Sequence, residues 1–190
     1  MIVQLAGLPG TGKSTLAQAL TRELGPKTLL LDKDRVRDAL FGPRLVTYTR
    51  DQDDFCVRLI HQTAARHLRE YPGAAVVLDG RTCSQRYQIE EVQHLAAETG
   101  QPLRLIECVC PDQVAARRLQ QDLLTGAHPA ANRDHALHLR LKAHAEPITV
   151  PALRLDTSAP LPDCTRAAVN YLSAGHALIA QPAPKGAPTP

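Results

Sequence analysis

Residues 7–14, Gly-Leu-Pro-Gly-Thr-Gly-Lys-Ser, constrain the fold of this chain more than any other segment. They match the pattern G-x-x-x-x-G-K-[ST] at every fixed position, and that pattern requires a strand before it and a helix after it. The apolar run 2–6 has the character of a buried strand, and residues 14–24 carry apolar side chains at helical spacing. We therefore predict a phosphate-binding loop made of Gly7, Leu8, Pro9, Gly10, Thr11, Gly12, Lys13, Ser14 and Thr15.

The chemistry of such a loop follows from its residue types. Glycines allow successive backbone N–H groups to turn towards phosphate oxygens, and the N-terminus of the following helix adds positive potential. In loops of this kind the lysine, here Lys13, reaches the β- and γ-phosphates, and the hydroxyl of Ser14 binds Mg²⁺. We therefore expect ATP and Mg²⁺ as the cofactors.

Strand and helix patterns alternate along the chain. Apolar runs predict strands over 2–6, 28–32, 74–80, 102–110 and 152–157. Helical spacing predicts helices over 14–24, 34–40, 51–71 and 84–99, from Pro111 onward, and over 163–180, with a loop over 125–135. Alternation of this kind, with strands that are apolar throughout, indicates an α/β fold with a parallel sheet covered on both faces.

The composition is that of a soluble globular domain. Of the 190 residues, 44% are hydrophobic and 22% are charged, and the net charge of +3 suits phosphorylated small molecules better than duplex DNA. The N-terminus lacks the regions of a signal peptide and its apolar stretch is too short to cross a bilayer, so we expect a cytoplasmic protein without a membrane partner. The five cysteines have no metal-ligand spacing and are expected to be free thiols.

Domain boundaries follow from the same pattern. We expect one domain over residues 1–180, with a lid around 118–135 that is rich in small residues. The segment 181–190 has four prolines in ten residues and is expected to be a disordered tail.

The segment "LDKDRVRDAL" (31–40) follows the second predicted strand, at the edge of the sheet where open α/β folds bind ligands. Asp34 and Arg37 are three residues apart and share one face of a helix. Asp34 is placed to accept a proton from an acceptor hydroxyl, and Arg37 to hold an acceptor phosphate. The alternative is a helix start with a capping acid and solvated charges.

Two further sets of side chains follow later strands. Asp79 ends the third predicted strand, where an acid can orient Mg²⁺, and Arg81 lies two residues beyond it. Arg117, Arg118 and Arg133 lie on the helix after the fourth strand and on the loop that follows. An arginine from this group would stabilise charge on the transferring phosphoryl group. The alternatives are a capping Asp and solvated arginines.

Aromatic and histidine residues carry a weaker signal. Tyr48, Phe55 and Tyr87 are candidates to line an acceptor pocket, although the spacing of Phe55 favours the core. The histidines show no metal-binding pattern and are expected to be solvated or buried rather than ligands.

Taken in order, "GLPGTGKSTLA", "LDKDRVR", "VVLDGRT" and "CVCPDQVAARRL" resemble the small P-loop kinases. The chain is most similar to the polynucleotide 5′-hydroxyl kinase domain and the AAA_33 group, with adenylyl-sulfate kinase, chloramphenicol phosphotransferase and zeta toxin as related types. The resemblance covers roughly residues 1–160.

The resemblance implies a P-loop NTPase three-layer α/β/α sandwich with strand order 2-3-1-4-5. It implies the base role for Asp34, the acceptor contact for Arg37, the acid role for Asp79, a lid role for Arg117 or Arg133, and adenine near residues 156–158. One departure is Asp79-Gly80-Arg81-Thr82, where the polynucleotide kinases carry D-[TN]-x-N.

These observations predict an ATP-dependent kinase that phosphorylates a hydroxyl of a small molecule, a nucleotide or a 5′-hydroxyl polynucleotide. An ATPase or nucleotide-gated switch, which transfers phosphate to water, is one alternative. A nucleotide-binding module without catalysis is the other.

Overall fold

The computed structural model of the chain describes residues 1–125, 130 and 132–177. Within these residues a parallel sheet of five strands has the order β2-β3-β1-β4-β5, which confirms both the α/β prediction and the implied strand order. The strands are β1 (Ile2–Ala6), β2 (Leu29–Asp32), β3 (Val76–Asp79), β4 (Leu103–Val109) and β5 (Ala152–Asp156). The predicted tail 181–190 and part of the predicted lid, residues 126–129 and 131, lie outside the described residues.

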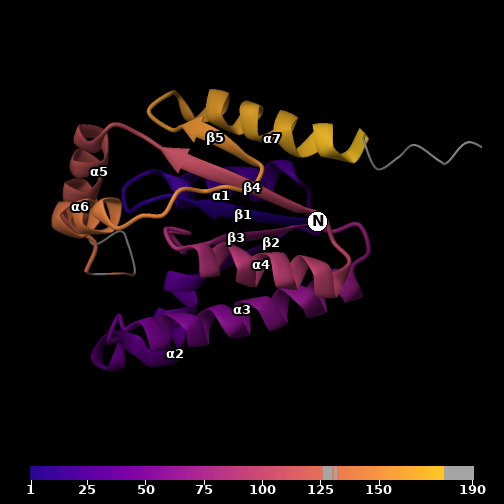
Figure 1. Cartoon of the computed structure of the whole chain (residues 1–190), viewed down its shortest axis with the longest axis horizontal. Coiled ribbons are helices and arrows are strands. Elements are labelled where there is room, and N and C mark those ends of the chain that lie inside the picture. Colours follow the sequence, from indigo (N-terminus) through magenta and orange to yellow (C-terminus); the bar gives the residue numbers. More distant parts are fainter. Residues whose placement is uncertain (126–129, 131, 178–190) are drawn as a thin grey trace, which may run out of the picture.

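Helices cover both faces of the sheet, and further helices lie beyond the carboxyl ends of the strands (Figure 1). They are α1 (Lys13–Glu23), α2 (Lys33–Leu45), α3 (Arg50–Glu70), α4 (Arg86–Thr99), α5 (Asp112–Thr125), α6 (His135–Ala143) and α7 (Leu161–Ala177). Among the described residues, none of these helices is both long enough and apolar enough to cross a membrane.

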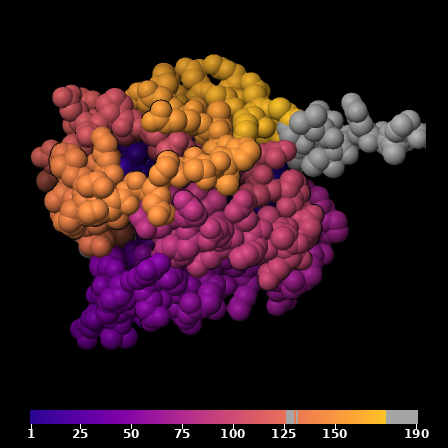
Figure 2. All heavy atoms as spheres, in the orientation of Figure 1, coloured from indigo at the N-terminus to yellow at the C-terminus, as the bar shows by residue number. Residues whose placement is uncertain are grey.

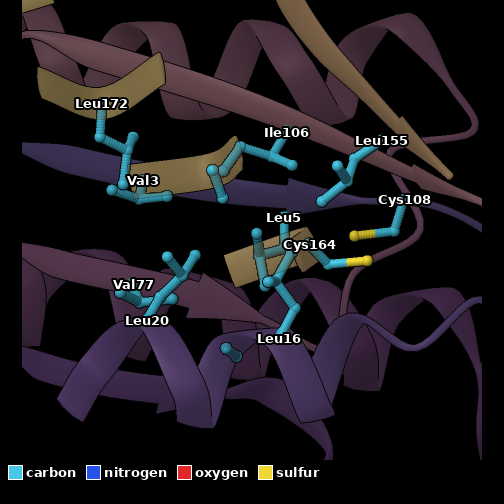
Figure 3. Packing of buried hydrophobic residues seen from close by; sticks show 12 residues of the cluster. Val3, Leu5, Leu16, Leu20, Val77, Ile106, Cys108, Leu155, Cys164 and Leu172 are labelled. Carbon is cyan, nitrogen blue, oxygen red and sulfur yellow. The ribbon is translucent and has the colours of Figure 1, made fainter. Parts of the chain in front are cut away.

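The central strand β1 shows how the layers form. Its side chains are fully buried and alternate between the two faces of the sheet. Val3 and Leu5 belong to a cluster with residues of α1 and α7 (Figure 3), whereas Ile2 packs with Ile60 and Val92 of α3 and α4. Burial of a strand on both faces is the reason that β1 is apolar apart from Gln4, whose amide donates to the carbonyl oxygen of Leu5 at 2.8 Å.

Some predicted boundaries and one predicted core residue differ from the structure. Gly42, with φ 60° and ψ 176°, breaks α2 as expected, but helical turns resume and continue to Leu45. Phe55 was expected in the core and is 39% exposed, because the buried stripe of α3 runs through Cys56 and Ile60 instead. Phe55 meets Phe41 edge to face on the surface.

Helix α6 begins at the end of the segment predicted as a loop. Its leucines alternate with polar residues, a period of two that does not indicate a helix. The carboxylate of Asp134 accepts the N–H of Leu137 at 2.6 Å and begins the helix as an N-cap.

All five cysteines are free thiols, as predicted. Burial raises the pKa of the Cys83 and Cys108 thiols to about 12, so both remain protonated and act as small apolar side chains.

Candidate active site

The loop between β1 and α1 has the backbone that its glycines predict. Gly7, Gly10 and Gly12 have φ values of 138°, 81° and 77°, which L side chains rarely adopt. At Gly10 an added Cβ would lie 2.8 Å from the carbonyl oxygen of Ala115 on α5, so no side chain fits there without a shift. The loop is therefore held closely against α5, and its N–H groups precede the first turn of α1.

Lys13 is buried at the base of this loop. Its Nζ donates to the carbonyl oxygens of Gly7, at 2.6 Å, and Leu8, at 2.9 Å. Burial lowers the pKa of Lys13, and Arg133 lowers it further, whereas Asp79 raises it. The ammonium group therefore sits among neutral oxygens, and phosphate oxygens would be stronger acceptors for it.

A single cavity of about 870 Å³ opens beside this loop. Figure 2 shows indigo atoms of the N-terminal segment at the bottom of a hollow between the orange and the yellow parts of the chain. The cavity is lined by parts of the phosphate loop, the β2–α2 junction, the start of α3, the loop after β3, and residues of α5 and α6. The sequence-predicted residues on its wall are Pro9, Gly10, Gly12, Lys13, Ser14, Thr15, Asp34, Arg37, Tyr48, Arg81, Tyr87, Arg118 and Arg133.

Asp79 ends β3 and is 4% exposed. Its Oδ1 has no hydrogen-bond partner among the residues that the structure describes. A buried carboxylate oxygen without a partner is costly unless a cation or an ordered water meets it. Asp79, together with the half-buried hydroxyl of Ser14, thus fits an Mg²⁺ ion that also takes phosphate oxygens. The described part of the chain holds no group of three or more His, Cys, Asp or Glu side chains that could bind a metal without such help.

The junction of β2 and α2 carries the acids that face the cavity. The Oδ1 of Asp32 accepts the N–H of Asp34 at 2.9 Å and so caps α2. Burial raises the pKa of Asp32 to about 6, and the charges of Asp79 and Asp34 contribute further. The loop after β3 presses against this junction, since a Cβ on Gly80 would lie 2.8 Å from the backbone nitrogen of Lys33.

Asp34 belongs to an ion-pair network with α3. The Nη2 of Arg37, a side chain only 3% exposed, donates to Asp34 Oδ1 at 2.8 Å, and Nη1 of Arg37 donates to Asp53. The Nζ of Lys33 lies 2.7 Å from Asp53 Oδ2 and 3.4 Å from Asp34 Oδ1. The ring of Tyr48 lies 4.5 Å from the guanidinium of Arg37. We name Lys33, Asp34, Arg37 and Asp53 the ionic network.

A second set of ion pairs holds Arg81. Its Nη2 donates to Asp54 at 2.8 Å, and its Nη1 lies 2.7 Å from Glu91. The guanidinium of Arg50 lies 4.2 Å from the ring of Tyr87 and its Nε donates to the Tyr87 hydroxyl at 3.1 Å.

The arginines of α5 differ sharply in position. Arg117 is exposed and is not on the cavity wall, whereas Arg118 lines the cavity. Arg118 donates to the backbone oxygen of Thr157 at 2.7 Å and to its Oγ1 at 3.2 Å. The Oγ1 of Thr157 in turn donates to Thr11 O at 2.8 Å. The loop after β5, where adenine was expected, is thereby joined to the phosphate loop.

His138 joins α6 to the phosphate loop. It is 1% exposed, and its Nδ1 lies 2.8 Å from the carbonyl oxygen of Pro9. Because a carbonyl only accepts, Nδ1 carries the proton in this contact. Its Nε2 lies 3.4 Å from Asp112, whose pKa is lowered mainly by hydrogen bonds from Lys142.

Sequence reasoning missed several residues of the site. Lys33, Asp53 and Asp54 were not singled out. Thr157 was placed only within the segment expected near adenine, and His138 only among histidines expected to be solvated or buried, as it is. Local spacing does not identify these contacts, because the hydrogen-bond partners of these side chains lie 16 to 146 residues away in the chain.

Comparison with known proteins gives the family and the fold. The family model AAA_33, described as an AAA domain, matches residues 2–148. No curated protein sequence matches the chain.

Three solved structures illustrate the fold. Mycobacterium tuberculosis APS kinase in complex with AMPPNP and APS is 19% identical, with 90% of this chain and 96% of that chain covered and a TM-score of 0.66. A gluconokinase from Sinorhizobium meliloti 1021 is 16% identical, with 94% and 97% covered and a TM-score of 0.68. Chaetomium thermophilum Kti12 in complex with ADP-AlF3 is 13% identical, with 92% and 98% covered and a TM-score of 0.65. The chain therefore has the P-loop kinase fold.

Proposed function

The chain belongs to the AAA_33 family, and from that premise we propose that it is an ATP-dependent kinase that phosphorylates a hydroxyl group. One observation carries the proposal. The buried carboxylate of Asp34 and the phosphate loop with Lys13 and Ser14 line one cavity, on neighbouring elements at the carboxyl edge of the sheet. An ATPase needs only a positioned water molecule. A cavity that has a buried carboxylate in addition to the phosphate loop suits the binding of an acceptor molecule.

Each residue then has a role in phosphoryl transfer. The loop N–H groups and Lys13 hold the β- and γ-phosphates of ATP. Asp34 accepts the proton of the acceptor hydroxyl while the hydroxyl oxygen bonds to the γ-phosphorus and the bond to the β,γ-bridging oxygen breaks, leaving ADP. Arg37, whose contact with Asp34 is 2.8 Å long, orients that carboxylate.

Mg²⁺ would be held by Ser14 and, directly or through water, by Asp79, and it would neutralise charge on the phosphates. On the opposite wall we assign Arg118 and Arg133, and not the exposed Arg117, to the transferring phosphoryl group. A mobile or preorganised arginine stabilises negative charge that develops on the phosphoryl oxygens.

The solved relatives support this proposal by what their names state. One is a kinase bound to AMPPNP and APS, one is a gluconokinase and one holds ADP-AlF3. Five free cysteines suit a reducing compartment, so we place the reaction in the cytosol.

The proposal is tested by following the γ-phosphate of labelled ATP in the presence of Mg²⁺ and a panel of hydroxyl acceptors. Wild type should transfer label to at least one acceptor class. Lys13→Ala should lose both ATP binding and transfer, whereas Asp34→Asn should lose transfer and keep its ATP affinity. Label released only as free phosphate, at a rate that no acceptor changes and that persists in Asp34→Asn, would reassign the protein as an ATPase or switch.

A further inference from the structure

Basic side chains at the two ends of the cavity have different partners. At the nucleotide end, Lys13 donates to the carbonyl oxygens of the phosphate loop, and Arg118 donates to oxygens of Gly10 and Thr157. None of these acceptors carries a charge. The positive charges of Lys13 and Arg118 are therefore available to a phosphate chain.

At the acceptor end, which we define as the wall formed by the ionic network, Tyr48, Arg81 and Tyr87, every buried cation already meets carboxylates. Arg37 is shared between Asp34 and Asp53, and Lys33 pairs with Asp53 at 2.7 Å. Arg81, 8% exposed, donates a hydrogen bond to Asp54 at 2.8 Å and lies 2.7 Å from Glu91 in an ion pair that lacks hydrogen-bond geometry. The terminal nitrogens of both arginines thus have anionic partners that belong to the protein.

An acceptor that carries a phosphate, sulfate or carboxylate would have to compete for these cations. Breaking a buried pair leaves a carboxylate without its partner in a poorly hydrated place, which is strongly unfavourable. A cationic acceptor faces the same difficulty, because the carboxylates of the acceptor end are equally occupied. The exposed Arg50, which also lines the cavity, faces the carboxylate of Asp54 at 3.8 Å and is screened by solvent. Charge therefore gives an acceptor little binding free energy at this end.

Uncharged hydrogen-bonding groups complete the wall. Tyr48, Gln85, Tyr87 and Gln88 line the cavity on this side. The Tyr87 hydroxyl accepts from Arg50, and the amides of Gln85 and Gln88 make hydrogen bonds with uncharged groups of the chain. Hydroxyl and amide groups both donate and accept hydrogen bonds, and so match the hydroxyls of a sugar or polyol. Such groups discriminate strongly against a ligand that lacks the matching hydroxyls.

We propose that the acceptor is an uncharged, polyhydroxylated small molecule of the sugar or polyol class, and not a phosphorylated nucleotide or a polynucleotide. This inference rests on the proposed kinase function. Arg37 then serves to position Asp34, and it does not bind an acceptor phosphate.

The test uses acceptors in sets that share a carbon skeleton and differ in charge. Each neutral probe (an aldose, an alditol or a nucleoside) is offered beside its anionic relative (the aldonate, the sugar phosphate or the nucleotide) and, for sugars, the amino sugar. A 5′-hydroxyl oligonucleotide is included. Label transfer from ATP is measured as kcat/KM for each, and ATP binding is measured separately.

We expect the preferred acceptor to be neutral and to exceed its charged relatives by about tenfold or more in kcat/KM. An anionic or cationic relative that is equal or better, or the oligonucleotide as best acceptor, overturns the inference and leaves the kinase function intact. If the protein binds ATP and transfers label to no acceptor, the kinase function itself fails.

A charge variant supplies an independent test. Asp54→Asn removes one anionic partner of Arg81. The ratio of kcat/KM for an anionic acceptor to kcat/KM for its neutral relative should rise by about tenfold, with ATP affinity unchanged. Glu91→Gln removes the other partner of Arg81 and should shift the ratio in the same direction, which covers the case that one variant fails to fold. Glu70→Gln, an exposed change of the same charge at the far end of α3, is the control and should leave the ratio unchanged. An unchanged ratio in both folded variants overturns the inference.

Discussion

Replacing Asp32 by Asn should make the stability of the protein less dependent on pH. Burial, followed by the charges of Asp79 and Asp34, raises the pKa of Asp32 from 3.8 to about 6. Between these two values the folded state keeps a proton that the unfolded chain releases. The unfolded state therefore binds fewer protons, and the free energy of unfolding falls as the pH rises. The contribution is largest below pH 3.8 and is lost as the pH passes 6.

The size of the effect follows from the folded pKa. One pH unit below that pKa the proton contributes about 1.4 kcal/mol, so wild type should lose about 1.4 kcal/mol relative to Asp32→Asn between about pH 5 and pH 8. Asparagine keeps the oxygen that accepts the N–H of Asp34 at 2.9 Å, so the cap of α2 survives. The pair with Arg35, 3.6 Å long and with the arginine 67% exposed, contributes little.

The measurement is urea unfolding of both proteins at several pH values, without nucleotide and with a chelator present. Asp38→Asn removes an exposed carboxylate from the same helix and serves as the matched control. The free energies of unfolding of wild type and Asp32→Asn should differ less at acidic pH than at pH 8. Two parallel stability curves, or a difference that changes in the opposite direction, would refute the assignment of a raised pKa to Asp32.

Three further predictions test single contacts. Asp79→Asn should leave the urea midpoint in chelator unchanged or higher, because the buried Oδ1 of Asp79 has no hydrogen-bond partner among the described residues, and should abolish the Mg²⁺ dependence of ATP affinity in a titration of the metal. His138→Ala should lower the free energy of unfolding by about 1–3 kcal/mol and weaken ATP binding, whereas His138→Asn, which can still donate to Pro9, should lose less in the same assays. Leu5→Ala at the centre of the sheet should cost about 2–5 kcal/mol in urea unfolding, with Phe55→Ala as an exposed comparison that costs much less.

Strands and loops whose own residue types indicate their structure were predicted correctly from the sequence. A strand such as β1 is buried on both faces and four of its five residues are apolar, so its apolar run identifies it directly. The phosphate loop was found because its glycines meet a backbone requirement that no other residue satisfies at low cost. The inward face of α4, with Ile89 and Leu95 buried, follows from helical spacing alone.

Helix α6 and the exposure of Phe55 were not predicted, and the reason is physical in each case. The leucines of α6 alternate with polar residues, and the helix buries His138 in place of an apolar stripe. Phe55 satisfies the spacing of a buried face, yet α3 extends beyond the sheet at its N-terminal end (Figure 1), where Phe41 is its neighbour. Tertiary context decides both outcomes, and spacing along the chain does not contain it.

The electrostatic character of the site depends on which charged residues lie next to each other in space. The sequence supplies only the number of charged residues and their order along the chain. A net charge of +3 and several arginines near strand ends favour a phosphorylated acceptor when they are read along the chain. Arg37 and Arg81, however, reach Asp53 and Asp54, which lie 16 and 27 residues away and come together because α3 packs across the start of α2 and the end of β3. Lys13 and Arg118 meet only neutral oxygens in the contacts described for them, because their surroundings are backbone and Thr157. In the proposed mechanism, basic side chains at one end of the cavity hold the triphosphate, whereas basic side chains at the other end are paired with carboxylates of the protein. The proposed preference for a neutral acceptor rests on this difference in pairing.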